Sequence, residues 1–333
     1  MRIGVLFGGK SGEHEVSLRS ARSVIDAIDR TRYEVVPIGI DKEGLWCRSD
    51  DTLALQGGRP FIEACSDVLK NLDVVFPVLH GPFGEDGTIQ GMLEIAGIPY
   101  VGASVLGSCI GLDKDVTKRL LRDAKIRIAD FLVYKRKPDF EEVVERLGLP
   151  FFVKPVTMGS SVGLTKVNSF VEFESSVDLA FSFDARIIIE ETIYGREIEC
   201  SVLGLEAPIA SLPGEIVPKG GVYSYENKYL DPEGAKFILP AKLSPQKIKE
   251  IQEMAINVFE LLCCEGMARV DFFMDQYENI YLNELNTIPG FTSISLYPKM
   301  WEVSGIPYAE LIQRLITLAL EKSMRKNLLS VSI

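Results

Sequence analysis

The stretch 266–295, GMARVDFFMDQYENIYLNELNTIPGFTSIS, constrains the fold more strongly than any other part of this chain. Two β-prone runs, 269–275 and 280–286, flank the turn-forming residues 276–279, and this pattern predicts a β-hairpin. Side chains alternate between the two faces of a strand, so one face of the hairpin is apolar and should be buried. That face carries Val270, Phe272, Met274 and Leu285.

The opposite face of this hairpin carries charge. If the four-residue turn is symmetric, Asp271 faces Glu284 and Arg269 faces Asn286. Two carboxylates with roughly 5 Å between their Cβ atoms repel each other, so a positive group should lie between them. Mg²⁺ favours such hard oxygen ligands, whereas the alternative is an ordinary solvated hairpin face. The Pro-Gly pair and the small hydroxyl residues of 289–295 are typical of a binding loop and favour the metal site.

Length and charge limit the classes of protein to which this chain can belong. Its 333 residues suffice for two or three domains of about 100–150 residues. The net charge of −11, without a cluster of Lys and Arg, argues against a nucleic-acid partner. No apolar run approaches the roughly 18–20 residues of a membrane span, and the N-terminal apolar run is too short for a signal peptide. We therefore expect a cytoplasmic protein that binds small molecules but neither nucleic acid nor membrane.

The cysteines are consistent with a reducing cytosol, because none of them forms a C-x-x-C pair. Cys263 and Cys264 end an apolar helical run, and we expect both in the core. The six cysteines are Cys47, Cys65, Cys109, Cys200, Cys263 and Cys264.

Residues 1–110 alternate between strand and helix patterns, which favours an open parallel sheet. Strands are predicted at 3–7, 33–40 and 73–79, and helices at 16–28 and 89–96. Glu15 suits the start of the first helix, where a carboxylate complements the dipole. Asp86 is the predicted N-cap of the second.

The first strand contains a misleading motif. Gly4, Gly9, Lys10 and Ser11 satisfy the P-loop pattern G-x-x-x-x-G-K-[ST]. In a true P-loop the intervening residues wrap the phosphates, but here residues 5–8 are mostly buried-strand types. We therefore reject a phosphate-binding P-loop at this position.

The rest of the chain divides into two further blocks, 111–195 and 196–333, which with 1–110 we interpret as three domains. The middle block has a Gly/Ser-rich loop at 157–163, between predicted strands at 151–154 and 164–167, then a helix at 169–181 and a strand at 186–190; a helix at 113–121 precedes them. The last block is predicted to hold strands at 196–203 and 208–216, a helix at 245–264, the hairpin and a helix from residue 308. The long aperiodic segment 219–234 is typical of a lid.

Several segments together resemble one family. The hairpin motif RVDFF…NELNTIPGFTS, the loop GGKSGEHEVS, the loop LHGPFGEDGTIQG and the FFVKP…TMGSSVG…IIIEE series are similar to motifs of ATP-grasp ligases, and most of all to the D-alanine–D-alanine ligase family. The segment KGGVYSYENKYLDPEG resembles the closing loop of that family. The resemblance covers nearly the whole chain. It implies a three-domain α/β ATP-grasp fold: an N-terminal open parallel sheet, a central α+β lid domain and a C-terminal α+β domain with the metal-binding hairpin.

The resemblance also implies roles for residues on the substrate loops. Glu13, Ser160 and Tyr229 would link three loops over the second substrate. His80 would lie near the first substrate, and Ser295 would hold the carboxylate of the second. Arg269 and the N–H of Gly290, which lies in a tight turn, are our candidates for stabilising a tetrahedral oxyanion.

The nucleotide site is implied in the same way. Glu190 would contact the adenine amino group, Ile193 the ring through its backbone, and Glu197 the ribose. Glu191 stands where many relatives carry Lys, so a backbone contact with ATP is expected of it. The phosphates would be bound by Lys114, Lys154, Ser161 and Lys228. The metal ligands would be Asp271, Glu284 and Asn286, holding two Mg²⁺ ions, with Mn²⁺ as a substitute.

The implied reaction is ATP-dependent ligation of two D-alanines through an acyl phosphate, for peptidoglycan precursors. Members of the family are often homodimers. One alternative is D-alanine–D-lactate ligation, against which Tyr229 argues because it resembles the dipeptide-forming members; another is a different ATP-grasp carboxylate–amine ligase. A non-catalytic binding protein would not need Asp271, Glu284 and Asn286 together. A P-loop NTPase would depend on Lys10.

Overall fold

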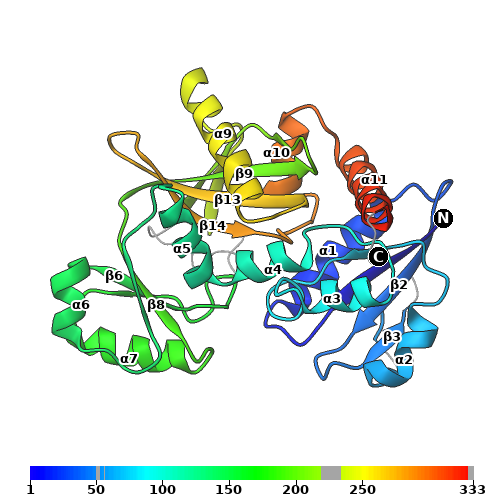
Figure 1. Cartoon of the computed structure of the whole chain (residues 1–333), viewed down its shortest axis with the longest axis horizontal. Helices are drawn as coiled ribbons and strands as arrows, with labels where there is room; N and C mark the ends of the chain where they lie inside the picture. The colour runs from blue at the N-terminus through cyan, green and yellow to red at the C-terminus, as the bar shows by residue number, and fades with distance from the viewer. Residues whose placement is uncertain (50–52, 56, 219–233, 329–333) are drawn as a thin grey trace.

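The computed structural model describes residues 1–49, 53–55, 57–218 and 234–328, and this part of the chain contains three β-sheets (Figure 1). In the view of Figure 1 the central sheet lies on the left, the N-terminal sheet on the right, and the C-terminal sheet above and between them. The predicted lid residues Lys228 and Tyr229 lie outside the described residues. None of the helices in these ranges combines the length and the apolar character that crossing a membrane requires.

The N-terminal sheet is mainly parallel, as predicted. Its strand order is β3 (Trp46–Arg48), β2 (Glu34–Ile40), β1 (Arg2–Gly8) and β4 (Val74–Pro77). β1 pairs in parallel with β2 and β4, whereas the unpredicted edge strand β3 is antiparallel. β1 is buried on both faces, which explains its continuous apolar run. The helices of this region are α1 (His14–Ala27), α2 (Phe61–Val68), α3 (Thr88–Ile95) and α4 (Val105–Leu112).

The start of α3 differs from the prediction. Its N-cap is Gly87, which has a φ of +86°, and not Asp86. The Asp86 carboxylate instead accepts hydrogen bonds from the N–H groups of Phe83 (2.8 Å) and Thr88 (2.9 Å). Asp86 therefore shapes the loop before the helix, and the left-handed cap favours glycine at the next position. Glu15 lies in the first turn of α1, as predicted.

The central sheet is antiparallel, in the order β5 (Phe131–Tyr134), β8 (Ile187–Glu191), β6 (Phe151–Pro155) and β7 (Thr165–Val167). The helices α6 (Phe140–Leu147) and α7 (Phe170–Phe181) pack on it through one apolar cluster. Side chains alternate along β6, so Val153 is buried in that cluster while Lys154 points to the other face. α5 (Lys114–Asp123) borders this other face (Figure 1).

The C-terminal sheet carries the predicted hairpin. Its main path is β12 (Ala235–Ile238), β11 (Gly214–Pro218), β9 (Gly195–Gly204), β13 (Gly266–Asp275) and β14 (Ile280–Asn286), with β10 (Ile209–Ala210) beside β9. α9 (Pro245–Leu261) packs on one face, and α10 (Leu296–Val303) and α11 (Tyr308–Asn327) follow the hairpin. The prediction of a single strand at 208–216 was wrong. This segment forms two strands, β10 and β11, separated by residues that include Pro213, which has no N–H to donate to the sheet.

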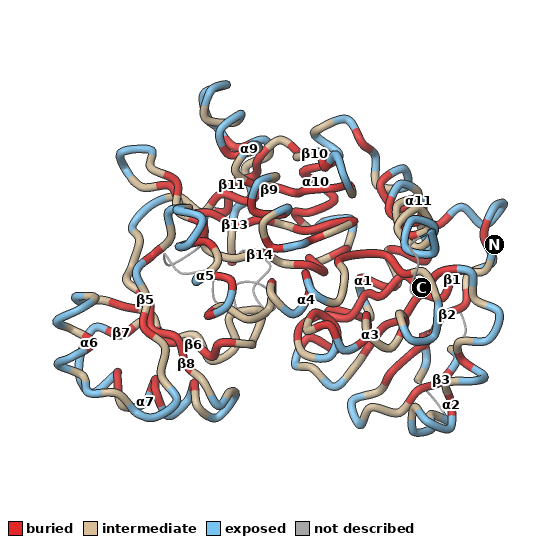
Figure 2. The backbone as a smooth tube through the Cα atoms, in the orientation of Figure 1, coloured by how far each residue is buried: buried red, intermediate tan, exposed pale blue. Residues whose placement is uncertain are grey.

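The register of the hairpin was predicted correctly near the charged residues. Arg269 pairs with Asn286 and Asp271 with Glu284. A β-bulge after Asp271 then shifts the register by one residue, so that Phe272 pairs with Leu282. The residues of the apolar face are buried, and Figure 2 shows many buried residues along β9 and β13. One cysteine prediction was wrong: Cys264 is buried but Cys263 is exposed, because α9 ends at Leu261 and Cys263 adopts a φ of +55° in the turn.

Candidate active site

A cavity of about 240 Å³ lies between the central and C-terminal sheets. Strands β6 and β8 supply one wall, and β9, β13 and β14 supply the other. All seven described residues that were predicted to bind ATP line it, as do Ser160 and two predicted metal ligands. These residues are Lys114, Lys154, Ser160, Ser161, Glu190, Glu191, Ile193, Glu197, Asp271 and Glu284.

One wall of this cavity is an arrangement of buried ion pairs. Glu190 on β8 pairs with Lys154 on β6 at 2.9 Å and with Lys118 on α5 at 3.3 Å. Lys118 was not predicted as a site residue. Its position four residues after Lys114 on the same helix places both side chains on one face, and this spacing could have identified it. Burial favours the uncharged form of Glu190, but the two lysines outweigh it and lower the pKa of this carboxyl. Glu190 is therefore ionised and fixes the direction of both lysines.

Lys114 and Glu191 are held by backbone groups. The Lys114 ammonium donates to the Met158 carbonyl at 2.6 Å, at the beginning of the Gly/Ser-rich loop. Burial lowers the pKa of Lys114, although the nearby Glu284 partly offsets this. The Glu191 carboxylate accepts from the Asp130 N–H at 2.8 Å, so its side chain is used structurally. The Glu191 N–H also donates to the Asp130 carbonyl at 3.0 Å, so both groups tie the end of β8 to Asp130, and the backbone contact with ATP stays a prediction.

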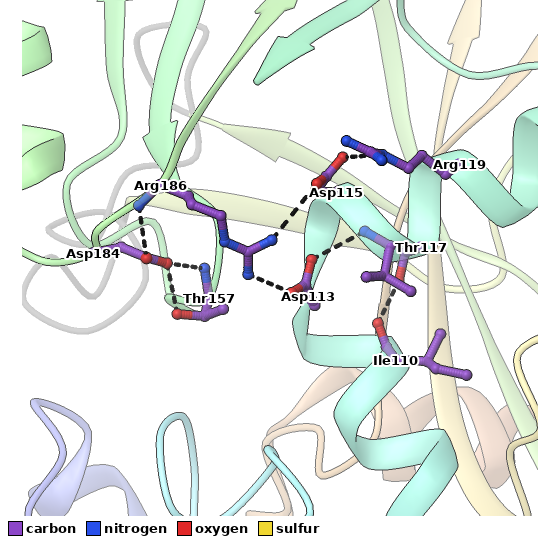
Figure 3. A network of polar contacts seen from close by, with 9 residues as sticks. Ile110, Asp113, Asp115, Thr117, Arg119, Thr157, Asp184 and Arg186 are labelled. Carbon is purple, nitrogen blue, oxygen red and sulfur yellow. Dashed lines mark hydrogen bonds and ion pairs between the residues drawn. The ribbon is translucent and has the colours of Figure 1, made fainter. Parts of the chain in front are cut away.

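A polar network ties the Gly/Ser-rich loop to the start of α5 (Figure 3). Asp184 accepts hydrogen bonds from the N–H and hydroxyl of Thr157, at 2.8 and 2.7 Å. Arg186 donates its own N–H to Asp184 and extends its guanidinium to Asp113 and Asp115. Asp113 is the N-cap of α5. The network therefore fixes the loop base and the helix that carries Lys114 relative to each other.

The other wall carries a row of carboxylates on three neighbouring strands. Asp271 on β13 lies opposite Glu199 on β9 and opposite Glu284 on β14. Arg269 binds Asp271 through two hydrogen bonds of 2.7 Å and lies 3.0 Å from Glu199. Glu199 was not predicted, because only sheet pairing brings it beside the hairpin. Burial alone would lower the pKa of Arg269, but Asp271 and Glu199 raise it well above its usual value.

The donor set on this wall is chemically suited to a hard divalent cation. Asp271, Glu284 and Asn286 present carboxylate and amide oxygens. Of the three carboxylates in the row, Asp271 and Glu199 contact one arginine, Arg269. Asn286 donates to Asp271 at 2.9 Å. Within the described ranges no group of three or more His, Cys, Asp and Glu side chains is placed so that it could hold a metal ion by itself. Mg²⁺ commonly completes its shell with phosphates and water.

Glu13 contacts Ser160, which lines the cavity. The Ser160 hydroxyl donates to the Glu13 carboxylate, joining the N-terminal region to the Gly/Ser-rich loop. Glu13 occupies the N-cap position of α1 but makes no capping bond there, so its side chain is directed to this contact. Gly81, with a φ of +72°, approaches so closely that a Cβ would lie 2.7 Å from the Glu13 carboxylate. The predicted contact of Tyr229 with this pair lies outside the described residues.

The turn after β14 places Gly290 beside Ser295. A Cβ on Gly290 would lie 3.2 Å from the Ser295 hydroxyl, and this hydroxyl contacts Thr292 at 2.7 Å. His80 is buried nearby, with Nδ1 2.9 Å from the Ile288 carbonyl and Nε2 3.2 Å from the Ser20 hydroxyl. Both ring nitrogens of His80 therefore already have protein partners.

Lys10 of the rejected P-loop motif lines a different cavity. This cavity, of about 330 Å³, lies beside the N-terminal sheet among apolar residues that include Trp46, Phe61 and Ile89. Residues 5–8 belong to β1, which confirms the prediction that they form a strand and not a phosphate-binding loop. Lys10 is thus separate from the charged cavity.

Models of two protein families match the chain. "D-ala D-ala ligase N-terminus" matches residues 2–103 and "D-ala D-ala ligase C-terminus" matches residues 120–317. The D-alanine–D-alanine ligase of Oceanobacillus iheyensis is 47% identical, over 99% of this chain and 98% of the relative. D-alanine–D-alanine ligase A of Escherichia coli K12 is 46% identical, over 100% of this chain and 99% of the relative.

Solved structures agree with the sequence relatives. A D-alanine–D-alanine ligase from Coxiella burnetii has a TM-score of 0.86 and 38% identity, covering 98% of this chain and 96% of that one. The VanG D-Ala:D-Ser ligase from Enterococcus faecalis has a TM-score of 0.82 and 36% identity, covering 96% and 99%. The Bacillus anthracis D-alanine–D-alanine ligase complexed with ATP has a TM-score of 0.79 and 30% identity, covering 98% and 99%.

Proposed function

The chain belongs to the D-alanine–D-alanine ligase family, and from this premise we propose that it joins two D-alanine molecules into D-alanyl-D-alanine at the cost of ATP. ADP and phosphate are released, and the dipeptide serves as a peptidoglycan precursor. The observation that carries the proposal is the cavity between two sheets, which gathers seven residues suited to ATP next to the carboxylate-bearing hairpin. The three-domain division into 1–110, 111–195 and 196–333 belongs to the same proposal.

ATP would bind in this cavity with its phosphates toward Lys114 and Lys154. Lysine offers a compact charge on a flexible stem, so Lys154 can leave Glu190 and turn to a phosphate. Ser161 would donate to the phosphates as well, with Lys228 from the lid. Glu190 and the backbone of Glu191 and Ile193 would meet the adenine, and Glu197 the ribose.

Asp271, Glu284 and Asn286 would hold Mg²⁺. The chemistry that a metal held there would supply is neutralisation of the phosphate charge during phosphoryl transfer. Two ions, with Mn²⁺ as a substitute, are part of this proposal. Arg269 binds Asp271 and so fixes the orientation of this carboxylate before any metal arrives.

The chemistry then proceeds in two steps. The carboxylate of the first D-alanine takes the terminal phosphoryl group of ATP, giving an acyl phosphate and ADP. The neutral amine of the second D-alanine attacks the acyl carbon, and the resulting oxyanion is stabilised by Arg269 and the N–H of Gly290. Phosphate leaves and the amine loses its proton, which completes the amide. Glu13 and Ser160, joined by Tyr229, would orient the second D-alanine, and Ser295 would bind its carboxylate.

One assay tests the proposal. Phosphate release with MgATP is measured for D-alanine alone and for D-alanine paired with D-serine or with D-lactate. We expect the fastest release, with equimolar dipeptide, from D-alanine alone. Release that requires D-lactate or D-serine would assign the chain to another acceptor, as in the D-Ala:D-Ser ligase with which it shares 36% identity. No release from any pair, or loss of activity in Lys10→Ala, would overturn the ligase proposal.

A further inference from the structure

Three buried side chains from the N-terminal region hold the turn that contains Gly290. The Glu85 carboxylate accepts from the Ile288 N–H at 2.9 Å. His80 Nδ1 lies 2.9 Å from the Ile288 carbonyl. The Ser20 hydroxyl accepts from the Phe291 N–H at 3.4 Å. The three side chains thus bind three backbone groups that bracket Gly290 on both sides.

A neutral His80 satisfies every bond of this cluster. The Ile288 carbonyl can only accept, so Nδ1 carries the ring proton and donates it. Nε2 then accepts from the Ser20 hydroxyl, whose oxygen accepts in turn from Phe291. Burial lowers the pKa of His80, which agrees with this arrangement. Each polar atom in the chain of bonds therefore has a compatible partner.

Glu85 links the same turn to a second loop. Its other carboxylate oxygen accepts from the Gly81 N–H at 2.8 Å, and Gly81 itself lies against Glu13. Burial, together with the charge of Glu13, raises the pKa of Glu85 to about 8, although the N–H groups of Gly81 and Ile288 favour its charged form. Keeping an ionised carboxylate at this position therefore has a cost. Burial alone would favour an apolar side chain at this position. We therefore interpret the two hydrogen bonds of the Glu85 carboxylate as fixing the backbone positions of Gly81 and Ile288.

Apolar packing already anchors the turn without these bonds. Ile288 and Phe291 are buried in the main apolar cluster, and the Phe291 ring lies 5.6 Å from that of Phe76. Packing of this kind resists removal of the side chains from the core but leaves the peptide planes free to rotate by some degrees. Hydrogen bonds to the N–H and C=O of Ile288 remove that freedom.

We propose that Ser20, His80 and Glu85 are positioning residues that aim the Gly290 N–H at the oxyanion of the amide-forming step. The inference rests on the proposed function, since it needs Gly290 to act there. Ser20 and Glu85 had no role in that function, and His80 acts here through the turn. Loss of an outer-shell residue that orients a metal ligand typically costs about 10–100-fold in activity, and we expect a comparable loss for residues that orient a backbone donor.

The test compares two variants that each remove one serine hydroxyl from α1, and adds a third variant at Glu85. Ser20→Ala deletes the bonds to Phe291 and His80. Ser17→Ala is the matched control, because Ser17 is equally buried on α1 but bonds to Gly8 and Val78 instead. Glu85→Gln keeps the size of the side chain but sets an amide NH₂ against one of the two N–H groups. ADP and dipeptide are followed separately in a single turnover, and melting temperature is recorded for each variant.

We expect Ser20→Ala and Glu85→Gln to slow dipeptide formation about tenfold or more while ADP formation stays within about threefold of wild type. Ser17→Ala should change both rates by less than threefold. Equal slowing of both steps, or dipeptide rates that match Ser17→Ala in variants that still melt cooperatively, would overturn the inference. A wild-type enzyme that makes no dipeptide would instead refute the proposed function.

Discussion

The nucleotide cavity and the turn around Gly290 are both buried and polar, but they are held together differently. In the cavity, charged side chains pair with one another: Lys118 and Lys154 with Glu190, and Arg269 with Asp271. Around the turn, side chains bind backbone groups, as Glu85 does with the Ile288 N–H. The first arrangement can exchange partners, whereas the second is fixed by the chain itself.

This difference matches the two tasks that we propose. ATP brings several negative charges, so the lysines of the cavity must be able to pass from Glu190 to phosphate. A flexible lysine side chain permits this exchange, because the phosphate replaces Glu190 as its partner. The oxyanion forms only during the amide-forming step. A hydrogen-bond donor that stabilises it should already be fixed in the correct position before that step. Mutations in the cavity should therefore change binding and metal dependence, and mutations near the turn should change the rate of amide formation.

Arg269→Ala should have the largest effect, because Arg269 serves both regions. It lies between Asp271 and Glu199 and is the proposed oxyanion donor. Losing one such donor typically lowers kcat by about 10²–10³-fold. Removing it also takes away the arginine that contacts two buried carboxylates, Asp271 and Glu199, and breaking a buried ion pair typically costs about 3–5 kcal/mol of stability. Steady-state kinetics and chemical denaturation measure the two losses.

The conservative variant Arg269→Lys separates these losses. It keeps a positive charge between the carboxylates but has no planar fork for bidentate binding. Most of the stability should return, while kcat should remain well below wild type. Full recovery of kcat, or a rise in the KM for ATP as the only effect, would remove Arg269 from the oxyanion role.

Glu284→Gln should affect turnover mainly at low metal concentration. The change is nearly isosteric and removes one carboxylate charge from the row on β9, β13 and β14. We expect activity about 10- to 100-fold lower at limiting Mg²⁺, with partial recovery when Mg²⁺ is raised, because charge sets the affinity of such sites. Glu278→Gln, in the exposed turn of the same hairpin, is the control. Equal Mg²⁺ dependence of the two variants would exclude Glu284 from the metal site.

The hairpin shows how much the sequence can predict. Period-two alternation and a short turn were enough to pair Asp271 with Glu284 and to assign the buried face. The register beyond Asp271 could not be predicted, because the β-bulge adds a residue that no local pattern announces. The parallel N-terminal sheet was predicted instead from short apolar runs that alternate with helix patterns.

The partners of the site residues could not be predicted. Glu199 reaches Asp271 only through sheet pairing. Glu85 and Ser20 reach the Gly290 turn across 203 and 271 residues of sequence, and each has an ordinary local role as a loop carboxylate or a helix hydroxyl. Such contacts depend on how the domains pack, and one sequence carries no local signal for that. The residues of 219–233, which include the predicted lid residues, lie outside the described ranges.

Glu190→Gln should raise the KM for ATP about tenfold, which corresponds to the loss of a hydrogen bond to a charged group. Without its charge, Lys118 and Lys154 would face each other across a neutral amide. Glu191→Gln is the matched control on the same strand, since its side chain only accepts from the Asp130 N–H. Its effect on the KM should stay below threefold. Similar effects of both variants would argue against a special role for Glu190 in nucleotide binding.

The smallest predicted effect is a pH dependence of stability that comes from His80. Burial lowers the pKa of this imidazole in the folded protein below its usual value of 6.5, so below about pH 6.5 the unfolded chain binds a proton that the folded protein does not. The contribution of His80 to the free energy of unfolding should therefore fall as the pH drops from 6.5 toward the lowered pKa, by at most about 1.4 kcal/mol per pH unit. Glu85, whose pKa is raised in the folded protein, contributes with the opposite sign over this range, so His80 is isolated by comparing variants. His80→Gln should lose this part of the slope between pH 6.5 and 5.0, measured by urea denaturation. His14→Gln, at the only other histidine, shows the general effect of losing an imidazole from this region. If wild type and His80→Gln have the same slope, His80 is not held neutral, and the chain of bonds through Ser20 to Phe291 is not the one described.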